Sequence, residues 1–115
     1  MKGENKMKQT QTQKLADAIR EAALAAIAKG KEYENNDGGS CNLDTPMVLV
    51  PRGIKTRNVV DTQGRQLLGC GYGGGYYSVR VPLWGQGYQR TAMAEAARDR
   101  LCELGYTSYV RYVMD

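Results

Sequence analysis

The sequence predicts an α+β domain of the ferredoxin-like class, with the element order βαββαβ, an antiparallel sheet and an additional N-terminal helix. Three observations predict it: two segments with apolar residues at helical spacing, several short strand-like segments, and glycine-rich turns between them. The chain has 115 residues, of which 42% are hydrophobic and 24% charged, the size and balance of one soluble domain.

The N-terminal third of the chain predicts an arm, a helix and a loop. Residues 1–12 are polar and lysine-rich without periodicity, so we expect a disordered basic arm and a single domain over 13–115. Apolar side chains recur every fourth residue over 13–29, which predicts a helix that Gly30 ends as a C-cap. Its small side chains predict close packing against the protein's own sheet or a partner chain. A long polar loop is expected over 31–44.

The middle of the chain predicts three strands and one short helix. The apolar run 47–50 lies between two prolines and predicts a buried strand. Thr56 is placed to cap a helix over 56–66. Leu67 and Leu68, with residues 76–83, flank a glycine-rich turn and predict a hairpin, in which alternation directs Arg80 away from the core.

The last third predicts a helix and a closing strand. A glycine-containing loop over 84–89 leads to Thr91, which we expect to cap a helix ending at Leu104 and Gly105. The expected core face of this helix includes Met93, Ala97 and Leu101. The β-branched and tyrosine-rich residues 107–113 predict the final strand.

Composition excludes several functions. Histidine is absent, which removes Ser-His-Asp and Cys-His catalysis and histidine metal sites. Cys41, Cys70 and Cys102 are far apart in sequence, so we expect reduced packing residues and no zinc site. The acidic residues form no pair recognisable as an acid and a base. We therefore expect no enzyme, no cofactor, no metal and no membrane association, in a cytoplasmic protein.

Two glycine motifs do not define nucleotide sites. Residues 69–74 match the pattern G-x-G-x-x-G, but a strand is expected to follow where a dinucleotide fold needs a helix. Residues 85–91 lack the lysine and the spacing of a P-loop.

Charge and aromatic composition favour a ligand that contains phosphate and a base. Residues 51–90 contain six Lys or Arg residues and a single acidic residue, Asp61. The aromatic residues of the chain are eight Tyr and one Trp, with no Phe. Arginine binds phosphate through two parallel hydrogen bonds, and tyrosine offers a flat face for stacking. The alternatives are a solvated basic surface and half-buried strand tyrosines.

The start of the helix expected at Thr91 is the principal candidate site. Backbone N–H groups and the helix dipole favour an anion there, and glycines permit close approach. A capped helix with a solvated Arg90 is the structural alternative. The candidate ligand-binding residues are Trp84, Gly85, Gly87, Tyr88, Arg90 and Thr91, with Arg80 from the preceding strand.

The open face of the sheet is a second candidate, for RNA. The stretch 74–81 matches the stacking strand of RNA-recognition domains only in part. Binding by Tyr76, Arg80, Tyr109 and Arg111 requires the two tyrosines to be exposed on neighbouring strands and not covered by helices.

With its small size, the chain resembles small phage and prophage proteins in residues 38–44, in residues 85–87 with 90–91, and in the ending 112–115. The resemblance implies a counter-defence role in a bacterial host and transfers no site residues. We expect a non-enzymatic, homo-oligomeric protein that sequesters a nucleotide or nucleotide signal. The alternatives are inhibition of a host protein complex such as a CRISPR nuclease, as anti-CRISPR proteins do, and RNA binding.

Overall fold

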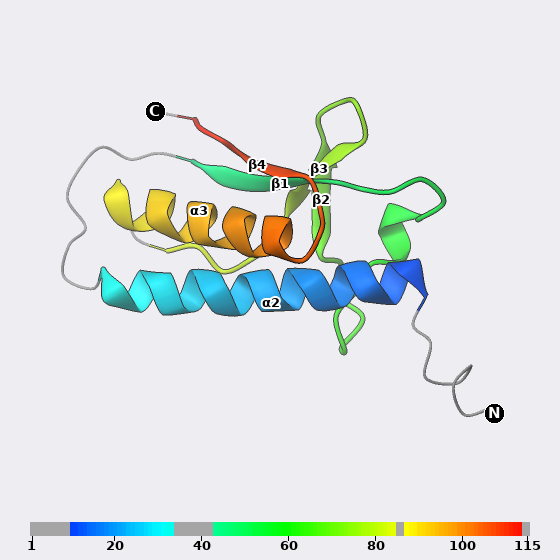
Figure 1. Ribbon diagram of the computed structural model, residues 1–115, viewed down its shortest axis with the longest axis horizontal. Helices are drawn as coiled ribbons and strands as arrows, with labels where there is room; N and C mark the ends of the chain where they lie inside the picture. The colour runs from blue at the N-terminus through cyan, green and yellow to red at the C-terminus, as the bar shows by residue number, and fades with distance from the viewer. Residues whose placement is uncertain (1–9, 34–42, 85–86, 114–115) are drawn as a thin grey trace.

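The chain forms an α+β fold in which two helices lie on one side of a four-stranded antiparallel sheet (Figure 1). The computed structural model describes residues 10–33, 43–84 and 87–113. The helices are α2 (Gln11–Glu32) and α3 (Tyr88–Glu103), and a 3-10 turn, η1, spans Thr56–Asn58. The strands are β1 (Thr45–Leu49), β2 (Leu68–Gly71), β3 (Tyr76–Val79) and β4 (Ser108–Arg111), in the order β2-β3-β1-β4.

The central strand β1 fixes which residues share a face of the sheet. Met47 lies opposite Ser78 on β3 and Tyr109 on β4. Its neighbour Val48 belongs to the hydrophobic core on the helix side. Because successive side chains of a strand point to opposite faces, Met47 and its two partners lie on the face turned away from the helices.

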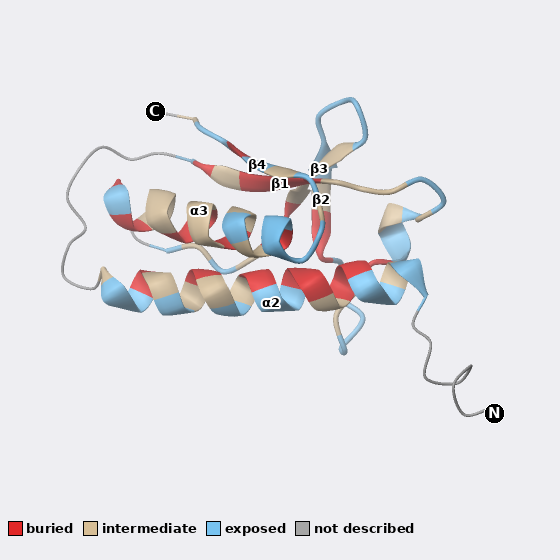
Figure 2. Cartoon of the chain, viewed as in Figure 1, coloured by how far each residue is buried: buried red, intermediate tan, exposed pale blue. Residues whose placement is uncertain are grey.

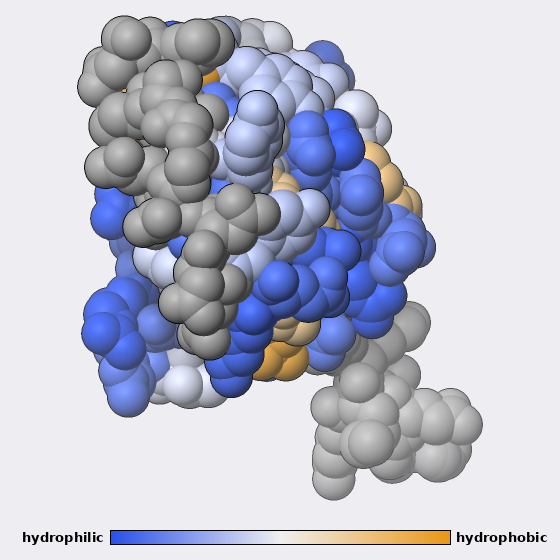
Figure 3. All heavy atoms as spheres, turned by 90° about the vertical axis from the view of Figure 1, so that its left-hand side faces the viewer, coloured by the Kyte–Doolittle hydropathy of each residue, from blue (hydrophilic) through white to orange (hydrophobic). Residues whose placement is uncertain are grey.

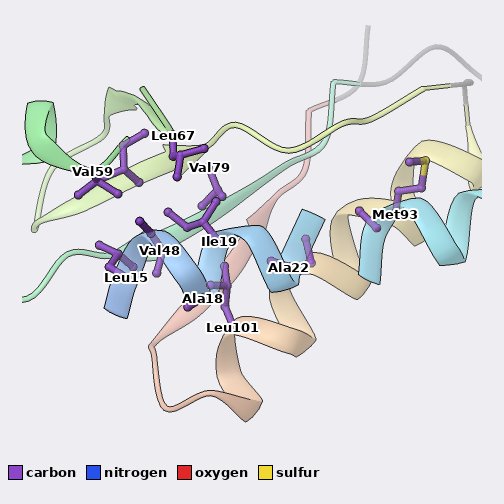
Figure 4. Packing of buried hydrophobic residues seen from close by; sticks show 14 residues of the cluster. Leu15, Ala18, Ile19, Ala22, Val48, Val59, Leu67, Val79, Met93 and Leu101 are labelled. Atoms are coloured by element: carbon purple, nitrogen blue, oxygen red, sulfur yellow. The ribbon is translucent and has the colours of Figure 1, made fainter. Parts of the chain in front are cut away.

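The core forms where both helices meet the sheet. The two helices pack along each other, and α3 also packs against β1 and β4. Buried residues follow the inward side of each helix (Figure 2). The expected core face of α3 is confirmed, since Met93, Ala97 and Leu101 are buried, and Figure 4 shows Leu15 and Ile19 of α2 among the buried strand residues. Burying a side chain of this size contributes about 1.5–3 kcal/mol relative to leaving it exposed.

The helix α2 differs from its prediction at both ends. Thr10 caps it through a capping box, in which Gln13 N–H donates to Thr10 Oγ1 at 3.1 Å and Thr10 N–H donates to Gln13 Oε1 at 3.2 Å. The helix therefore begins inside the segment predicted as a disordered arm. Gly30 is not a C-cap, because the helix continues to Glu32 and Tyr33 is its C-cap. A Cβ on Gly30 would lie 2.7 Å from both Met93 Sδ and Trp84 Cζ2, so glycine allows close packing, here against α3 and Trp84 and not against the expected sheet or partner chain.

The helix predicted over 56–66 is wrong, and with it the βαββαβ order. Only η1 forms, because the Asp61 carboxylate accepts the N–H groups of Gln63 and Arg65 and holds a turn. Gly64 completes the turn with a φ of 82°. The ferredoxin-like prediction thus holds only in its coarser part, an α+β fold with an antiparallel sheet and helices on one face.

Candidate functional site

The start of α3, predicted to bind an anion, lies four residues earlier than expected, since the N-cap is Gly87 and not Thr91. Gly87 is the N-cap with a φ of 56° and makes no side-chain capping bond. Thr91 is therefore a residue of the helix and not its cap, contrary to the prediction. Gly85 lies outside the described residues. The described surface at this end of the molecule is mainly hydrophilic (Figure 3).

The Thr91 hydroxyl binds an internal carboxylate. Its Oγ1 donates to Asp44 Oδ2 at 2.6 Å, and the other oxygen of Asp44 accepts the Val113 N–H at 3.0 Å. Asp44 is only 2% exposed. A buried carboxylate thus makes the contact that the sequence had assigned to a ligand, and its charge would repel a second anion placed beside it.

The other residues predicted at this site have separate environments. Trp84 packs against Gly30, and Tyr88 is 68% exposed. The buried Arg90 Nε has no hydrogen-bond partner among the residues that the structure describes. Arg80 is exposed next to β3, where its Nε lies near the position of a Cβ on Gly69. Among the described residues, no hydrogen bond or ion pair joins Arg80 to the start of α3.

A second group of polar aromatics and arginines lies on the sheet face turned away from the helices. We name it the tyrosine–arginine face, and its members are Tyr72, Tyr76, Tyr109, Arg80 and Arg111. Tyr109 faces Met47 across the β1–β4 pair, and Tyr76 faces Leu49 across the β1–β3 pair. The prediction that these tyrosines occupy neighbouring strands is wrong, because β1 lies between them.

Two contacts of aromatic rings join side chains of this face to one another. The rings of Tyr76 and Tyr109 meet edge to face, with centroids 5.0 Å apart and an interplanar angle of 74°. The guanidinium carbon of Arg111 lies 4.5 Å from the centre of the Tyr72 ring. Tyr109 and Tyr72 are 40% and 49% exposed, so both rings are accessible. Tyr76 is half-buried, so the expected exposure holds for Tyr109 and only in part for Tyr76.

The glycine-rich hairpin carries Tyr72 to Arg111. Tyr72 N–H donates to the Tyr76 carbonyl at 3.0 Å, and Tyr76 N–H donates to the Gly73 carbonyl at 3.1 Å. The three residues 73–75 all have positive φ, which glycine adopts without strain. Sequence reasoning missed Tyr72 as a site residue. Its one signal is its place as the single aromatic residue within 69–75.

The arginines of this face differ from those of the helices in their ion pairing. Arg80 and Arg111 have no carboxylate partner within the described residues, and the ion pairs found there all lie on the helices or in the turn at Asp61. They are Arg20–Asp17, Lys29–Glu32, Arg65–Asp61, Arg98–Asp99, Arg100–Glu21 and Arg100–Glu103. As far as the described residues go, the charges of the tyrosine–arginine face are thus free to meet an external anion.

Tyr112 follows β4 but faces the helices. Its hydroxyl donates to Glu95 Oε2 on α3 at 2.6 Å. This hydrogen bond, with burial, raises the pKa of the Tyr112 phenol above its ordinary value. Tyr112 therefore fastens the chain after β4 to α3 and is not part of the tyrosine–arginine face.

The cysteines do not match their predicted role. Cys70 and Cys102 are exposed and free, so they are not packing residues, and Cys41 lies outside the described residues. Over the described ranges, no three His, Cys, Asp or Glu side chains gather as a metal site would require. No helix within those ranges has the length and apolar character needed to cross a bilayer.

Comparisons of the chain with protein-family models, with curated proteins and with solved structures give no match.

Proposed function

We propose that this protein binds single-stranded nucleic acid through the tyrosine–arginine face, and that it binds RNA in preference to DNA. The observation that carries the proposal is the pair of ring contacts, Tyr76 with Tyr109 and Arg111 with Tyr72, on a helix-free surface whose arginines lack carboxylate partners among the described residues. The proposed ligand still contains a base and a phosphate, as the sequence predicts. Its proposed site is the sheet face and not the start of α3.

The chemistry of such a face fits a flexible single strand. Each base stacked on an aromatic ring contributes about 1–3 kcal/mol without selecting a sequence, because every base has a flat face. Arginine guanidinium groups hold phosphate oxygens through charge-assisted hydrogen bonds. A duplex hides its bases within the helix and would offer only its backbone, so the face favours single strands.

Fluorescence anisotropy with labelled single-stranded RNA, single-stranded DNA and duplex tests the proposal. We expect Tyr109→Ala and Arg111→Ala each to weaken single-strand binding by about 5- to 100-fold, the loss of one stacked base or charged contact. Arg20→Ala on α2 is the matched control, since it removes one charge from the helix side and should leave affinity within twofold.

The outcomes separate the possible ligands. Weaker RNA than DNA binding would reassign the face to single-stranded DNA, and binding that Tyr109→Ala and Arg111→Ala leave unchanged would overturn the site. If neither nucleic acid binds, an exposed Tyr and Arg surface of this kind fits a protein partner, as in the predicted inhibitor of a host complex.

A second candidate is a phosphate-bearing small ligand at the start of α3. This site is favoured by the buried Arg90 Nε, which has no described hydrogen-bond partner. It is disfavoured by the Asp44 carboxylate, which is hydrogen-bonded to Thr91. Native mass spectrometry after mixing with a nucleotide extract tests it and the predicted oligomer together. An adduct that persists in Arg90→Ala would exclude Arg90 from such a site.

A further inference from the structure

We infer that the loop after β1 is a second phosphate-binding element, which extends the nucleic-acid site beyond the tyrosine–arginine face. This inference rests on the proposed function. We name this loop the basic loop, and its cations are Arg52, Lys55 and Arg57. All three are exposed. The sequence contains no Asp or Glu between Asp44 and Asp61, so the loop has no acidic neighbour in the chain.

The basic loop has a fixed shape. Ile54 packs against the hydrophobic core, and Val59 is fully buried behind η1. Within the loop, Ile54 N–H donates to the Pro51 carbonyl at 3.3 Å and Asn58 N–H donates to the Lys55 carbonyl at 2.9 Å. The cations therefore project from an ordered backbone, and ligand binding need not order the loop first.

The loop begins beside the tyrosine–arginine face. Val50 N–H donates to the Gly75 carbonyl at 3.0 Å, and the preceding Leu49 faces Tyr76. At the other end of β1, Thr45 faces Arg111. In Figure 1, η1 lies beyond the end of β1 that is farther from the C-terminus, on the helix side of the sheet and close to the start of α2. Tyr76 and Tyr109 thus lie along β1 between Arg111 at one end and the start of the basic loop at the other, over roughly 13 Å.

The cations of the basic loop form no ion pair with the described residues. No carboxylate among the described residues pairs with Arg52, Lys55 or Arg57, whereas Arg20, Arg98 and Arg100 on the helices are all paired. A strand that stacks on the tyrosines and continues past Tyr76 would meet three cations that can contact its phosphates. Contacts of this kind depend on salt but not on sequence.

Binding of oligonucleotides of two lengths distinguishes a phosphate-binding loop from a basic surface that is only solvated. A labelled single strand of about 4 nucleotides reaches the tyrosines only, whereas one of about 12 reaches the loop as well, both within the site sizes of single-strand binders. The test variant is Arg52→Gln, Lys55→Gln and Arg57→Gln together. The matched control, Lys14→Gln, Arg20→Gln and Lys31→Gln, removes the same charge from exposed positions on α2. Circular dichroism confirms that both variants fold.

We expect the loop variant to bind the longer strand about tenfold more weakly and to reduce its salt slope by about 2, the value for three lost phosphate contacts. Its affinity for the shorter strand should stay within twofold, as should that of the control for both strands. Equal losses in the two triple variants would show a general charge effect and overturn the inference. An unchanged loop variant would also overturn it while leaving the proposed function intact, provided that Tyr109→Ala still weakens the shorter strand. Failure of the unaltered protein to bind either strand would overturn both.

Discussion

At the scale of single residues, Asp44 joins three parts of the chain that are far apart in sequence. It stands just before β1, and its carboxylate binds the Thr91 hydroxyl on α3 and the Val113 N–H after β4. We expect Asp44→Ala to lower the free energy of unfolding by about 1–3 kcal/mol, because the part-buried Val113 N–H loses its acceptor and the Thr91 hydroxyl keeps only the Gly87 carbonyl. Urea denaturation measures the change, with Asp99→Ala on the exposed side of α3 as the control. Equal losses in both variants would contradict a special role of Asp44.

Gly30 sets how closely α2 approaches the segment containing Trp84 and Met93. Alanine is the better helix former by about 1 kcal/mol, so on a free helix Gly30→Ala would stabilise. Here the added methyl group meets Met93 and Trp84 within 3 Å, and we expect a net loss of about 1–3 kcal/mol. Thermal denaturation checks the sign. A higher Tm would show that both side chains move aside without cost.

The site residues differ in how far the sequence could predict them. Tyr76, Arg80, Tyr109 and Arg111 follow from strand alternation, which needs no knowledge of strand order. The contact of Tyr72 with Arg111 depends on three consecutive positive φ values in the hairpin, and residue spacing does not encode the direction that results. The engagement of Thr91 with Asp44 joins residues 47 positions apart and was likewise outside the reach of local patterns.

At the scale of elements, the turn at Asp61 replaced a predicted helix and has its own pH dependence. Hydrogen bonds from the backbone of Arg65 and then of Gln63, with the nearby Arg65 charge, lower the pKa of Asp61. A carboxyl whose pKa is lower in the folded protein stabilises the fold above its unfolded pKa, and this stabilisation is lost as the pH falls through the folded value.

We therefore expect the Asp61 carboxyl to titrate at lower pH than an ordinary exposed aspartate. Carboxyl-detected NMR titration measures its midpoint. In Asp61→Asn, this contribution to the loss of stability in acid should disappear. A midpoint at the ordinary value, or an acid limb that Asp61→Asn leaves unchanged, would show that the turn does not depend on the charged form.

The two long helices and the strands were predictable in existence but not always at their ends, whereas the helix predicted over 56–66 does not form. The periodicity of α2 and α3 predicted both helices, and alternating residues predicted the hairpin of β2 and β3. The boundaries failed where side chains bind backbone groups. Thr10 extends α2 toward the N-terminus, and Asp61 takes the N–H groups that a helix would have used.

At the scale of the whole molecule, the charged groups divide between the two layers. Acidic residues of the described ranges lie on the helices, except for the buried Asp44 and the turn residue Asp61. Within these ranges the sheet side is therefore basic and the helix side mixed. This asymmetry predicts that nucleic acid approaches from the sheet side.

The helix α2 is an integral part of the core and not an appendage to a ferredoxin-like domain. Leu15 and Ile19 of α2 share one cluster with Val48, Val59 and Val79. We expect a chain that begins at residue 43 to lose cooperative folding, because the sheet residues would be exposed to water. Amide NMR dispersion and thermal melting test this. A dispersed spectrum from that shorter chain would show that the sheet and α3 suffice.

The packing of Trp84 against Gly30 gives the molecule an internal optical probe. Trp84 is the only tryptophan of the chain, and it lies at the contact between α2 and the segment leading into α3, whereas the proposed ligand face contains tyrosines. Excitation at the red edge of the absorption band therefore reports on the contact of Trp84 with α2 and not on the tyrosines. Quenching of tyrosine emission, recorded in the same cuvette, would follow a base as it stacks, so that loss of fold and gain of ligand are distinguishable without a label.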